Sequence, residues 1–343
     1  MKIRLFLSII VSFCLLSCGQ KELDIERPPH SGEEQLPEED NGNDQGEGEQ
    51  PEDPSQKEPE GGPGTKGWTT TEISEGMNLH SFTGSDTPTK AQQRVFVLET
   101  DLNNSRYRIG FSCQPGANGR ATTSEAQINS GAVAAVNATY ERGSVFIKVD
   151  GSTISNIPNH QIKGSDGSVD NWKSEAGAFM NSDGKLYLEF SGKDKQFTKL
   201  RPYYRNHTCP NIFTSAPMLI DNYDPVGERF VPVSLTEAQF ESQYLYEHPY
   251  RHQGVTHPRT AIALTKDNHL LLVVIDGRDG VIKGMSAEQV TKFLVYHFNP
   301  AYALNMDGGG STAISINGKV YNKPSGGSER AVPTHFLVFD DKK

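Results

Sequence analysis

The sequence predicts an α+β fold of mixed, strand-rich sheets with a few helices. Short runs rich in Val, Ile, Phe and Tyr recur between turn residues from residue 94 to residue 321. Helical signal is sparse by comparison, and its clearest case begins with the capping box of Ser286 and Gln289. The sequence contains no internal repeat of fixed period. These observations favour one domain, or two closely packed halves, dominated by strands.

The N-terminal segment is typical of a secretory signal. Lys2 and Arg4 precede an apolar run over residues 5–16, which is too short for a transmembrane helix. The Leu-Leu-Ser-Cys that ends it resembles a bacterial lipobox, in which Cys18 becomes the lipidated first residue of the mature chain. We therefore expect residues 1–17 to be a lipoprotein signal peptide; an ordinary signal peptide with an incidental cysteine is the alternative. The expected location is the outer membrane of the cell envelope, on its periplasmic or its surface face, with the lipid on Cys18 as the membrane contact.

Residues 18–67 are expected to form the lipidated cysteine and a disordered acidic linker. Most of the net charge of −10 lies here, because residues 21–67 carry 15 acidic and four basic side chains. The segment has almost no aromatic or β-branched residues, so it cannot bury enough apolar area to offset the entropy of ordering. The remaining domain, residues 68–343, is nearly neutral. Without a basic footprint it is expected to have no nucleic-acid partner.

The predicted strands are separated by turn signals. Asp267-Asn268 predicts one hairpin turn. Asn317-Gly318 predicts a second hairpin turn, of the primed type. Cys113 and Cys209 lie in loop-like sequence, and the residues leave open whether they form a disulfide. In chain order the strand candidates are residues 94–98, 107–112, 132–136, 144–149, 185–190, 260–264, 270–275, 302–304, 312–316 and 319–321.

Two helices are predicted in the C-terminal half. After Ser286, apolar residues recur at helical spacing through Val290 and Phe293 to His297, and Asn299-Pro300 ends the helix. A weaker helical pattern covers residues 235–246.

The histidines near residue 250 suggest a metal site, but the spacing argues against one. We expect Pro249 to break the helix that would place His248 and His252 on one face. No metal ligands are therefore predicted.

The densest special sequence is residues 305–312, Asn-Met-Asp-Gly-Gly-Gly-Ser-Thr, between two strand candidates. Three consecutive glycines allow positive φ and could let backbone N–H groups converge as an anion-binding nest beside Asp307. The motif lacks the lysine of a P-loop and the spacing of a dinucleotide fingerprint, which disfavours ATP and NAD. A plain glycine turn is the alternative.

Two arginines should lie at one end of the 260–275 hairpin. Arg259 leads into the first strand and Arg278 follows the second, so the pairing makes them neighbours. Paired arginines suit a planar oxyanion because each offers two parallel hydrogen bonds. Ordinary surface charge is the alternative explanation for either arginine alone. Glu288, in the first turn of the helix that follows Ser286, is a candidate carboxylate, but the helix dipole alone is enough to explain a carboxylate there. The loop of residues 322–330 adds Glu329 to the candidate carboxylates.

Several motifs together resemble the phosphodiester glycosidase family over about residues 90–340. The 305–312 run is the most specific of them. One departure is Asn-Ala-Thr-Tyr at residues 137–140, where members of that family more often have Asn-Gly-Gly-Phe. The matching segments are residues 131–137, 216–219, 257–261, 276–278, 284–288, 305–312 and 324–330.

The resemblance implies a glycosidase-type hydrolase of sugar-1-phosphate diesters, similar to the N-acetylglucosamine-1-phosphodiester α-N-acetylglucosaminidase of that family. The substrate would be a glycan or glycolipid phosphate outside the cytoplasm, and neither sugar nor aglycone is fixed. No cofactor is expected. The residues expected to bind the substrate or its phosphate are Asn137, Arg259, Asp276, Arg278, Asn305, Gly308, Gly309, Gly310, Ser311, Thr312, Ser325 and Arg330.

The expected chemistry needs charge stabilisation more than protonation. A phosphate ester is already a weak base, so it leaves with little help from a general acid, and arginines would stabilise its charge. The oxocarbenium-like centre needs a carboxylate as nucleophile or as base on water. Asp307 is the first choice for this role, with Glu288 or Glu329 as its partner. The alternatives are a noncatalytic surface glycan-binding lipoprotein and a metal-dependent phosphodiesterase.

Overall fold

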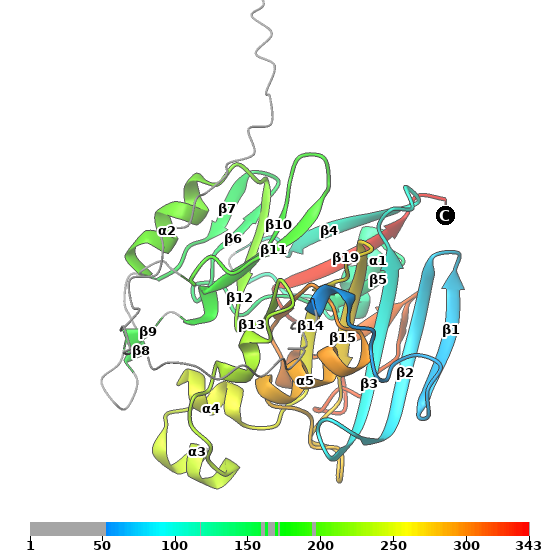
Figure 1. The fold of residues 1–343 in the computed structure, drawn as a ribbon. Coiled ribbons are helices and arrows are strands. Elements are labelled where there is room, and N and C mark those ends of the chain that lie inside the picture. The colour runs from blue at the N-terminus through cyan, green and yellow to red at the C-terminus, as the bar shows by residue number, and fades with distance from the viewer. Residues whose placement is uncertain are drawn as a thin grey trace, which may run out of the picture. The chain divides into compact units, whose positions relative to one another are not determined.

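Three antiparallel sheets surround a shared apolar core in the computed structural model (Figure 1). The structure describes residues 53–342 except 117, 159–161, 164–168, 171 and 194–196. The predicted strand-rich α+β class is confirmed. The lipobox with Cys18 lies outside the described residues. No helix in the described part of the chain is long and apolar enough to cross a membrane.

The first sheet has seven strands and carries the hairpin predicted at residues 260–275. Its central strand β15 is buried along nearly its whole length. Leu270 and Leu272 face the shared core, whereas Leu271 and Val273 face a second cluster on the other side. Apolar packing on both faces explains why this strand reads as a continuous apolar run. The strand order is β1 (Trp68–Ser74), β2 (Met77–Asp86), β3 (Ala91–Asp101), β15 (His269–Ile275), β14 (Arg259–Leu264), β16 (Tyr302–Asn305) and β13 (Met218–Asp221).

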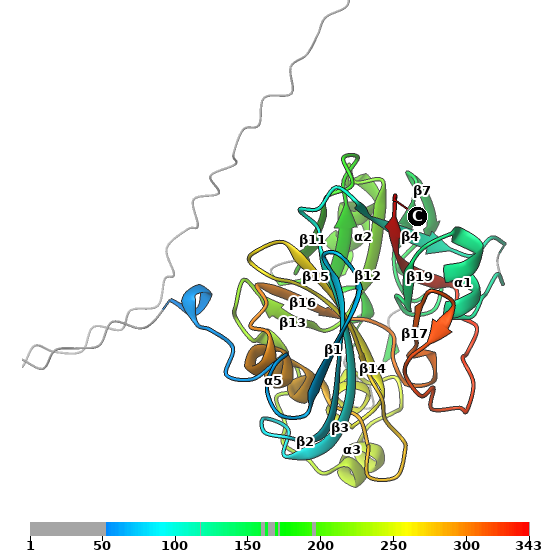
Figure 2. The ribbon, with the colours of Figure 1, turned by 90° about the vertical axis from the view of Figure 1, so that its right-hand side faces the viewer.

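Helix α5 (Ala287–His297) covers the outer face of the first sheet. The capping box predicted at Ser286 and Gln289 is formed by both of its hydrogen bonds. Val290 and Phe293 pack into the second apolar cluster, as their spacing predicts. Figure 2 shows α5 beside the strands of this sheet, at the left of the view, with α1 at the right.

The second and third sheets have five strands each. The second has the order β18 (Lys319–Val320), β17 (Ile314–Ile316), β5 (Ala134–Asn137), β19 (Thr334–Asp340) and β4 (Tyr107–Cys113), and α1 (Thr123–Ser130) packs beside it. The third has the order β11 (Leu186–Glu189), β10 (Ala176–Met180), β12 (Asn211–Ser215), β6 (Ile147–Val149) and β7 (Ser152–Ser155). Leu200 and Tyr204 of α2 (Phe197–Asn206) join an apolar cluster with residues of the third sheet. The remaining elements are the pair β8 (Ile162–Lys163) and β9 (Val169–Asp170), the helices α3 (Glu237–Gln243) and α4 (Pro249–Gly254), and the 3₁₀ turns Pro54–Gln56, Trp172–Ser174, Val226–Arg229 and Gly309–Ser311.

The sequence left open whether the two cysteines of the domain form a disulfide. Cys113 and Cys209 are both free thiols, so no disulfide joins them.

The chain packs against the domain before the predicted boundary at residue 68. Asn299 Nδ2 donates to the carbonyls of Pro54 and Lys57 at 3.1 and 2.7 Å, and Gly61 N donates to Tyr296 O. The acidic composition hid this docking because backbone groups, not apolar side chains, make most of the contacts.

Candidate active site

A narrow pocket of about 80 Å³ lies where several strands of the first sheet begin or end. Arg259 opens β14, Arg278 follows β15, and Asp307 follows β16. The two arginines expected at one end of the hairpin do line the same pocket. Its full lining is Tyr246, His252, His257, Arg259, Arg278, Asp307, Gly308, Gly309, Gly310 and Arg330.

The Asp307 backbone is fixed by hydrogen bonds to the second sheet. The Asn137 side chain, at the end of β5, donates to Asp307 O at 2.7 Å, and Asp307 N donates to Ala138 O at 3.0 Å. The Oδ1 atom of Asn137 accepts from Thr260 Oγ1 and from Ala313 N. Asn137 is fully buried, so it does not reach the pocket. Its amide instead joins three chain segments and holds Asp307 in place.

Several N–H groups of the glycine turn are used within the protein and are not available to an anion. Gly309 N donates to Pro258 O, and the N–H groups of Ser311 and Thr312 donate within the turn itself. The glycines are required for space and conformation. Gly309 has a φ of 61°, an added Cβ at Gly308 would lie 2.7 Å from Pro258 O, and one at Gly310 would collide with the guanidinium of Arg330.

The Asp307 carboxyl group is partly buried in the pocket wall, and desolvation raises its pKa to about 6. Hydrogen bonding to the Ser311 hydroxyl and to Gly308 N opposes that rise in pKa, whereas the negative charge of Glu141 adds to it. A carboxyl group with this pKa changes protonation near neutral pH, which is where an acid–base or nucleophilic group is useful.

Arg259 is buried and largely occupied by the protein. Its Nε donates to Met285 O at 2.8 Å, Nη1 donates to Gln253 Oε1 at 2.8 Å, and Nη2 donates to two further carbonyls. Burial, with a contribution from the charge of Arg278, lowers the pKa of Arg259 to about 10. The residue therefore stays cationic at neutral pH and brings a fixed positive charge to the floor of the pocket.

Arg278 and Arg330 are exposed and can move toward a ligand. Arg278 adopts a φ of 57°, an uncommon conformation for a residue with a side chain. Arg330 Nη1 lies 3.5 Å from Ser311 Oγ. Within the described residues, neither of them nor Arg259 has a carboxylate at ion-pair distance. Three uncompensated cations beside one carboxyl group favour an anionic ligand.

Two histidines complete the wall as neutral donors. Burial, with the charge of nearby arginines, lowers the pKa of His257 to about 3 and the pKa of His252 well below its ordinary value. His257 Nδ1 pairs with Arg278 Nη2 at 3.1 Å, and His252 Nδ1 pairs with Gln253 Nε2 at 3.2 Å. Because each Nδ1 must accept a hydrogen bond, the proton of each neutral ring lies on Nε2.

The structure does not bring the two expected partner carboxylates to the pocket. Glu288 is paired with Lys292 on the exposed side of α5. Glu329 accepts from Ser124 N at 3.0 Å and from the Ser124 hydroxyl, at the start of α1. Each carboxylate lies at the N-terminal end of a helix, Glu288 within the first turn of α5 and Glu329 against the start of α1, where the helix dipole favours a negative charge.

Four other predicted residues support the site from behind. The Asp276 carboxylate is buried and accepts from Asn322 Nδ2 and Lys323 N, which ties the 322–330 loop to β15. Asn305 is buried and donates to Ala216 O and to its neighbour Met306 O. Thr312 is buried behind the glycine turn, and Ser325 is partly buried in the 322–330 loop. None of the four lines the pocket.

Sequence reasoning missed several neighbours of Asp307. Tyr246, His252 and His257 line the pocket, and Glu141 and Lys173 act electrostatically on Asp307. Two of them had a usable signal, because Glu141 follows the altered Asn-Ala-Thr-Tyr segment and His257 begins the matching segment 257–261. Among the described residues, no group of three or more His, Cys, Asp or Glu side chains is arranged to hold a metal ion.

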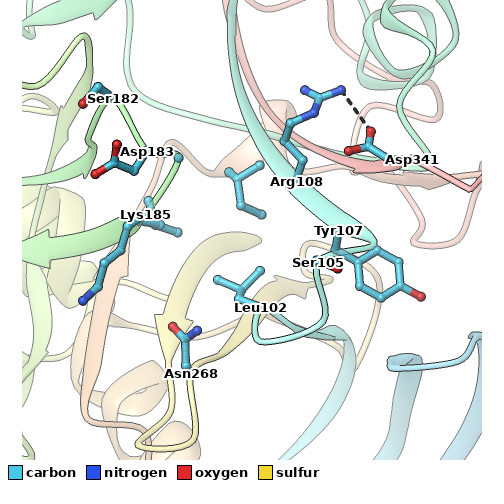
Figure 3. A pocket seen from close by; sticks show the side chains of 12 residues that line it. Leu102, Ser105, Tyr107, Arg108, Ser182, Asp183, Lys185, Asn268 and Asp341 are labelled. Carbon is cyan, nitrogen blue, oxygen red and sulfur yellow. Dashed lines mark hydrogen bonds and ion pairs between the residues drawn. The ribbon is translucent and has the colours of Figure 1, made fainter.

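A larger cavity of about 520 Å³ lies elsewhere, between the start of β4 and the β10–β11 turn (Figure 3). Arg108 is paired with Asp341 at 3.4 Å on one side, and Asp183 and Lys185 lie on the other. None of the residues predicted to bind substrate lies there. Its charges are balanced, so it lacks the uncompensated cations of the first pocket.

Comparisons with known proteins agree with the sequence resemblance. A family model described as "Phosphodiester glycosidase" matches residues 122–339, well over half of the chain. Among curated proteins, the SPbeta prophage-derived uncharacterized protein YomE of Bacillus subtilis (strain 168) is 36% identical over 79 residues. That match covers 23% of this chain and 12% of the relative, so it spans a small part of either protein.

Two solved structures share the fold. The catalytic domain of zebrafish N-acetylglucosamine-1-phosphodiester α-N-acetylglucosaminidase, auto-inhibited by its pro-peptide, aligns with a TM-score of 0.54 and 18% identity over 83% of this chain and 96% of that chain. A hypothetical protein from Synechocystis aligns with a TM-score of 0.53 and 15% identity over 81% of this chain and 64% of that chain. At these identities the likeness is one of fold.

Proposed function

The chain belongs to the phosphodiester glycosidase family, and from this premise we propose that it hydrolyses sugar-1-phosphate diesters at the bond between the anomeric carbon and its oxygen. The observation that carries the proposal is the pocket with Arg259, Arg278 and Arg330 around Asp307. The substrate class agrees with the activity named for the zebrafish relative, but the sugar here need not be the same.

The arginines have two tasks in this reaction. They bind the single negative charge of the diester, and they stabilise the second charge that develops as the phosphate monoester leaves. Arg278 and Arg330 supply hydrogen bonds, whereas the buried Arg259 supplies a fixed field. The Nε2–H groups of His252 and His257 are additional donors that need no positive charge.

Asp307 faces the opposite demand, since positive charge develops on the sugar ring. As a carboxylate it acts either as nucleophile at the anomeric carbon or as base on the attacking water. Water supplies the hydroxyl that ends on the sugar, and the aglycone leaves as its phosphate monoester, so the atoms balance. In the nucleophile route a second carboxylate acts as base on the water that cleaves the covalent intermediate, whereas the phosphate itself leaves with little help from an acid.

We assign that second role to Glu141. Asp307 N donates a hydrogen bond to Ala138 O, and Glu141 follows Ala138 by three residues in the sequence. Arg120 holds the Glu141 carboxylate with two hydrogen bonds of 2.9 and 2.7 Å. Its charge also contributes to the raised pKa of Asp307. Glu141 is also paired and lies outside the pocket lining, as Glu288 and Glu329 do, but its charge acts on Asp307, and for that reason it replaces them as the candidate.

Hydrolysis in ¹⁸O-enriched water tests the proposal. The purified protein is incubated with a panel of sugar-1-phosphate methyl esters, and both products are analysed by mass spectrometry. Label in the free sugar supports cleavage of the carbon–oxygen bond. Label in the phosphate would instead indicate a phosphodiesterase, and binding without turnover over the whole panel would indicate a glycan-binding protein.

We further propose that the domain acts outside the cytoplasm as an outer-membrane lipoprotein. The support is the lipobox at Cys18 with the acidic segment behind it. Its partners are then the carbohydrate phosphodiester and, through the lipid only, the membrane.

A further inference from the structure

The turn between α3 and α4 forms an exposed apolar lip at the pocket. Leu245 is 58% exposed and Tyr246 is 54% exposed, and they are consecutive in the sequence. Tyr246 also lines the pocket beside the arginines. Of the large hydrophobic side chains that the described residues expose, these are the only two adjacent in sequence. In Figures 1 and 2, α3 lies at the lower end of the view, where the turn leaves it.

The lip is held firmly, so its exposure does not result from a frayed loop. Arg251 Nη1 donates to Tyr244 O at 3.1 Å, and His248 N donates to Leu245 O at 2.9 Å. Trp172 Nε1 donates to Glu247 O at 3.1 Å. The Tyr246 ring packs edge-on against His252, which is partly buried. The fold therefore presents two apolar side chains to solvent in a fixed position.

Apolar surface fixed beside uncompensated cations suits an amphipathic anion. The pocket of about 80 Å³ has room for the charged group but not for both arms of a diester. One arm is the sugar, which must reach Asp307. The other arm has to leave the pocket across its rim, where Tyr246 lies and next to which the chain exposes Leu245. The Tyr246 ring is exposed and lines the pocket, so an arm that crosses the rim at this point contacts it.

We propose that the aglycone of the substrate is apolar and lies on the lip formed by Leu245 and Tyr246, so that the enzyme acts on sugar-1-phosphates esterified to an alkyl or lipid alcohol. This inference rests on the proposed function and narrows its substrate class. The bond that breaks is still the one between the anomeric carbon and its oxygen, and the alkyl phosphate is the leaving group.

The test is a chain-length series. kcat/KM is measured for N-acetylglucosamine-1-phosphate esters of methanol, butanol and octanol, with the sugar exchanged if the ¹⁸O panel favours another. If one side of the alkyl chain contacts the lip, each added methylene should raise kcat/KM roughly twofold, because about half of its free energy of burial is then gained. A polar aglycone of similar size, a hexose, should gain nothing over methanol.

Variants locate the contact. Leu245→Ser should lower the ratio of kcat/KM for the octyl and methyl esters by roughly fivefold. Ile128→Ser is the matched control, because Ile128 is 59% exposed but lies on α1 and does not line the pocket. That control should leave the ratio unchanged.

Three results would overturn the inference. A methyl ester turned over as fast as the octyl ester would show that the aglycone is not recognised by apolar contact, although the proposed function would stand. A Tyr246→Ser variant that lowers kcat/KM equally for all esters would mean that the ring contacts the sugar. Failure to hydrolyse any ester would overturn both proposals.

Discussion

At Asp307 the folded chain keeps a carboxyl group whose pKa lies near 6, above its ordinary value of 3.8, because the pocket wall desolvates it. Above pH 6 the folded protein must hold this group ionised at a cost. Below pH 4 both the folded and the unfolded chain protonate it, and the cost disappears. Function and stability therefore place opposite demands on this residue.

Asp307→Asn should separate the two demands. We expect kcat to fall by about 10²–10⁴. At pH 8 we expect the variant to melt at a higher temperature than the parent, with an unfolding free energy larger by up to about 3 kcal/mol. The stability gain should vanish toward pH 4. Calorimetry at both pH values, with a kinetic assay, measures both effects. Near-normal kcat would reduce Asp307 to a turn residue.

The parent enzyme should lose activity in acid for the same reason. If Asp307 acts as a carboxylate, kcat/KM falls as the pH drops through about 6. Loss of activity on the alkaline side of pH 6 instead would assign it the role of a proton donor.

The two arginines of the hairpin end should respond differently to truncation. Arg259 donates to three backbone carbonyls, so Arg259→Ala leaves buried acceptors unpaired and should cost on the order of 3 kcal/mol of stability. Arg278→Ala removes an exposed side chain and should raise KM about tenfold or more while the melting temperature stays nearly constant. Thermal unfolding and Michaelis–Menten kinetics of both variants decide this. A large stability loss for Arg278→Ala would make it a structural residue.

Glu141→Gln tests the second carboxyl group. We expect kcat to fall by about 10² or more, because the Gln side chain keeps the shape and loses the acid–base function. Glu288→Gln and Glu329→Gln serve as matched controls and should keep kcat within about twofold, since Lys292 and Ser124 hold these two carboxylates away from Asp307. If a control variant lost activity and Glu141→Gln kept it, the assignment made from the sequence would be restored.

Among the elements, the glycine turn after β16 controls where Arg330 can lie. A Cβ at Gly310 would occupy the position of the Arg330 guanidinium, which is a flexible group that can swing away. Gly310→Ala should therefore raise KM severalfold with little loss of stability. Gly326→Ala is its control, because a Cβ there meets nothing closer than 3.8 Å. Unchanged kinetics for Gly310→Ala would show that Arg330 does not contact the substrate.

Elements with apolar packing on both faces, or with a complete cap, could be predicted from the sequence. The strands β14 and β15 and the helix α5 are of this kind. Helix α1 was missed although Thr122 and Glu125 form a capping box, because its apolar face is too small to give a helical period. Pro249 was expected to break a helix, but it starts α4 at a position where its missing N–H costs nothing.

The candidate site could be predicted only in part, because its residues come together through tertiary contacts. The motif residues Arg259, Arg278, Asp307 and Arg330 do meet, since strand pairing brings their elements to one end. Glu288 and Glu329 looked equally suitable in sequence, and only their partners in space remove them. The histidines were hidden because their role depends on burial near arginines, and burial is a property of the folded chain.

For the whole molecule, the location is tested by Cys18→Ala. The variant should leave the membrane fraction and appear in a soluble one, since a single lipidated residue would provide the only anchor. Fractionation followed by palmitate labelling measures this. Membrane association and labelling that persist in the variant would disprove the lipoprotein assignment.

The docking of residues 54–61 also decides how the domain bears mechanical load. A pull on the preceding chain first strains the hydrogen bonds to Tyr296 and Asn299, at the C-terminal end of α5. This helix has 11 residues and is about 16 Å long, and just before its other end the carbonyl of Met285 holds Arg259. Tension that the proposed anchor at Cys18 would apply to the preceding chain therefore enters the domain about one helix length from Met285 and the arginine that it holds.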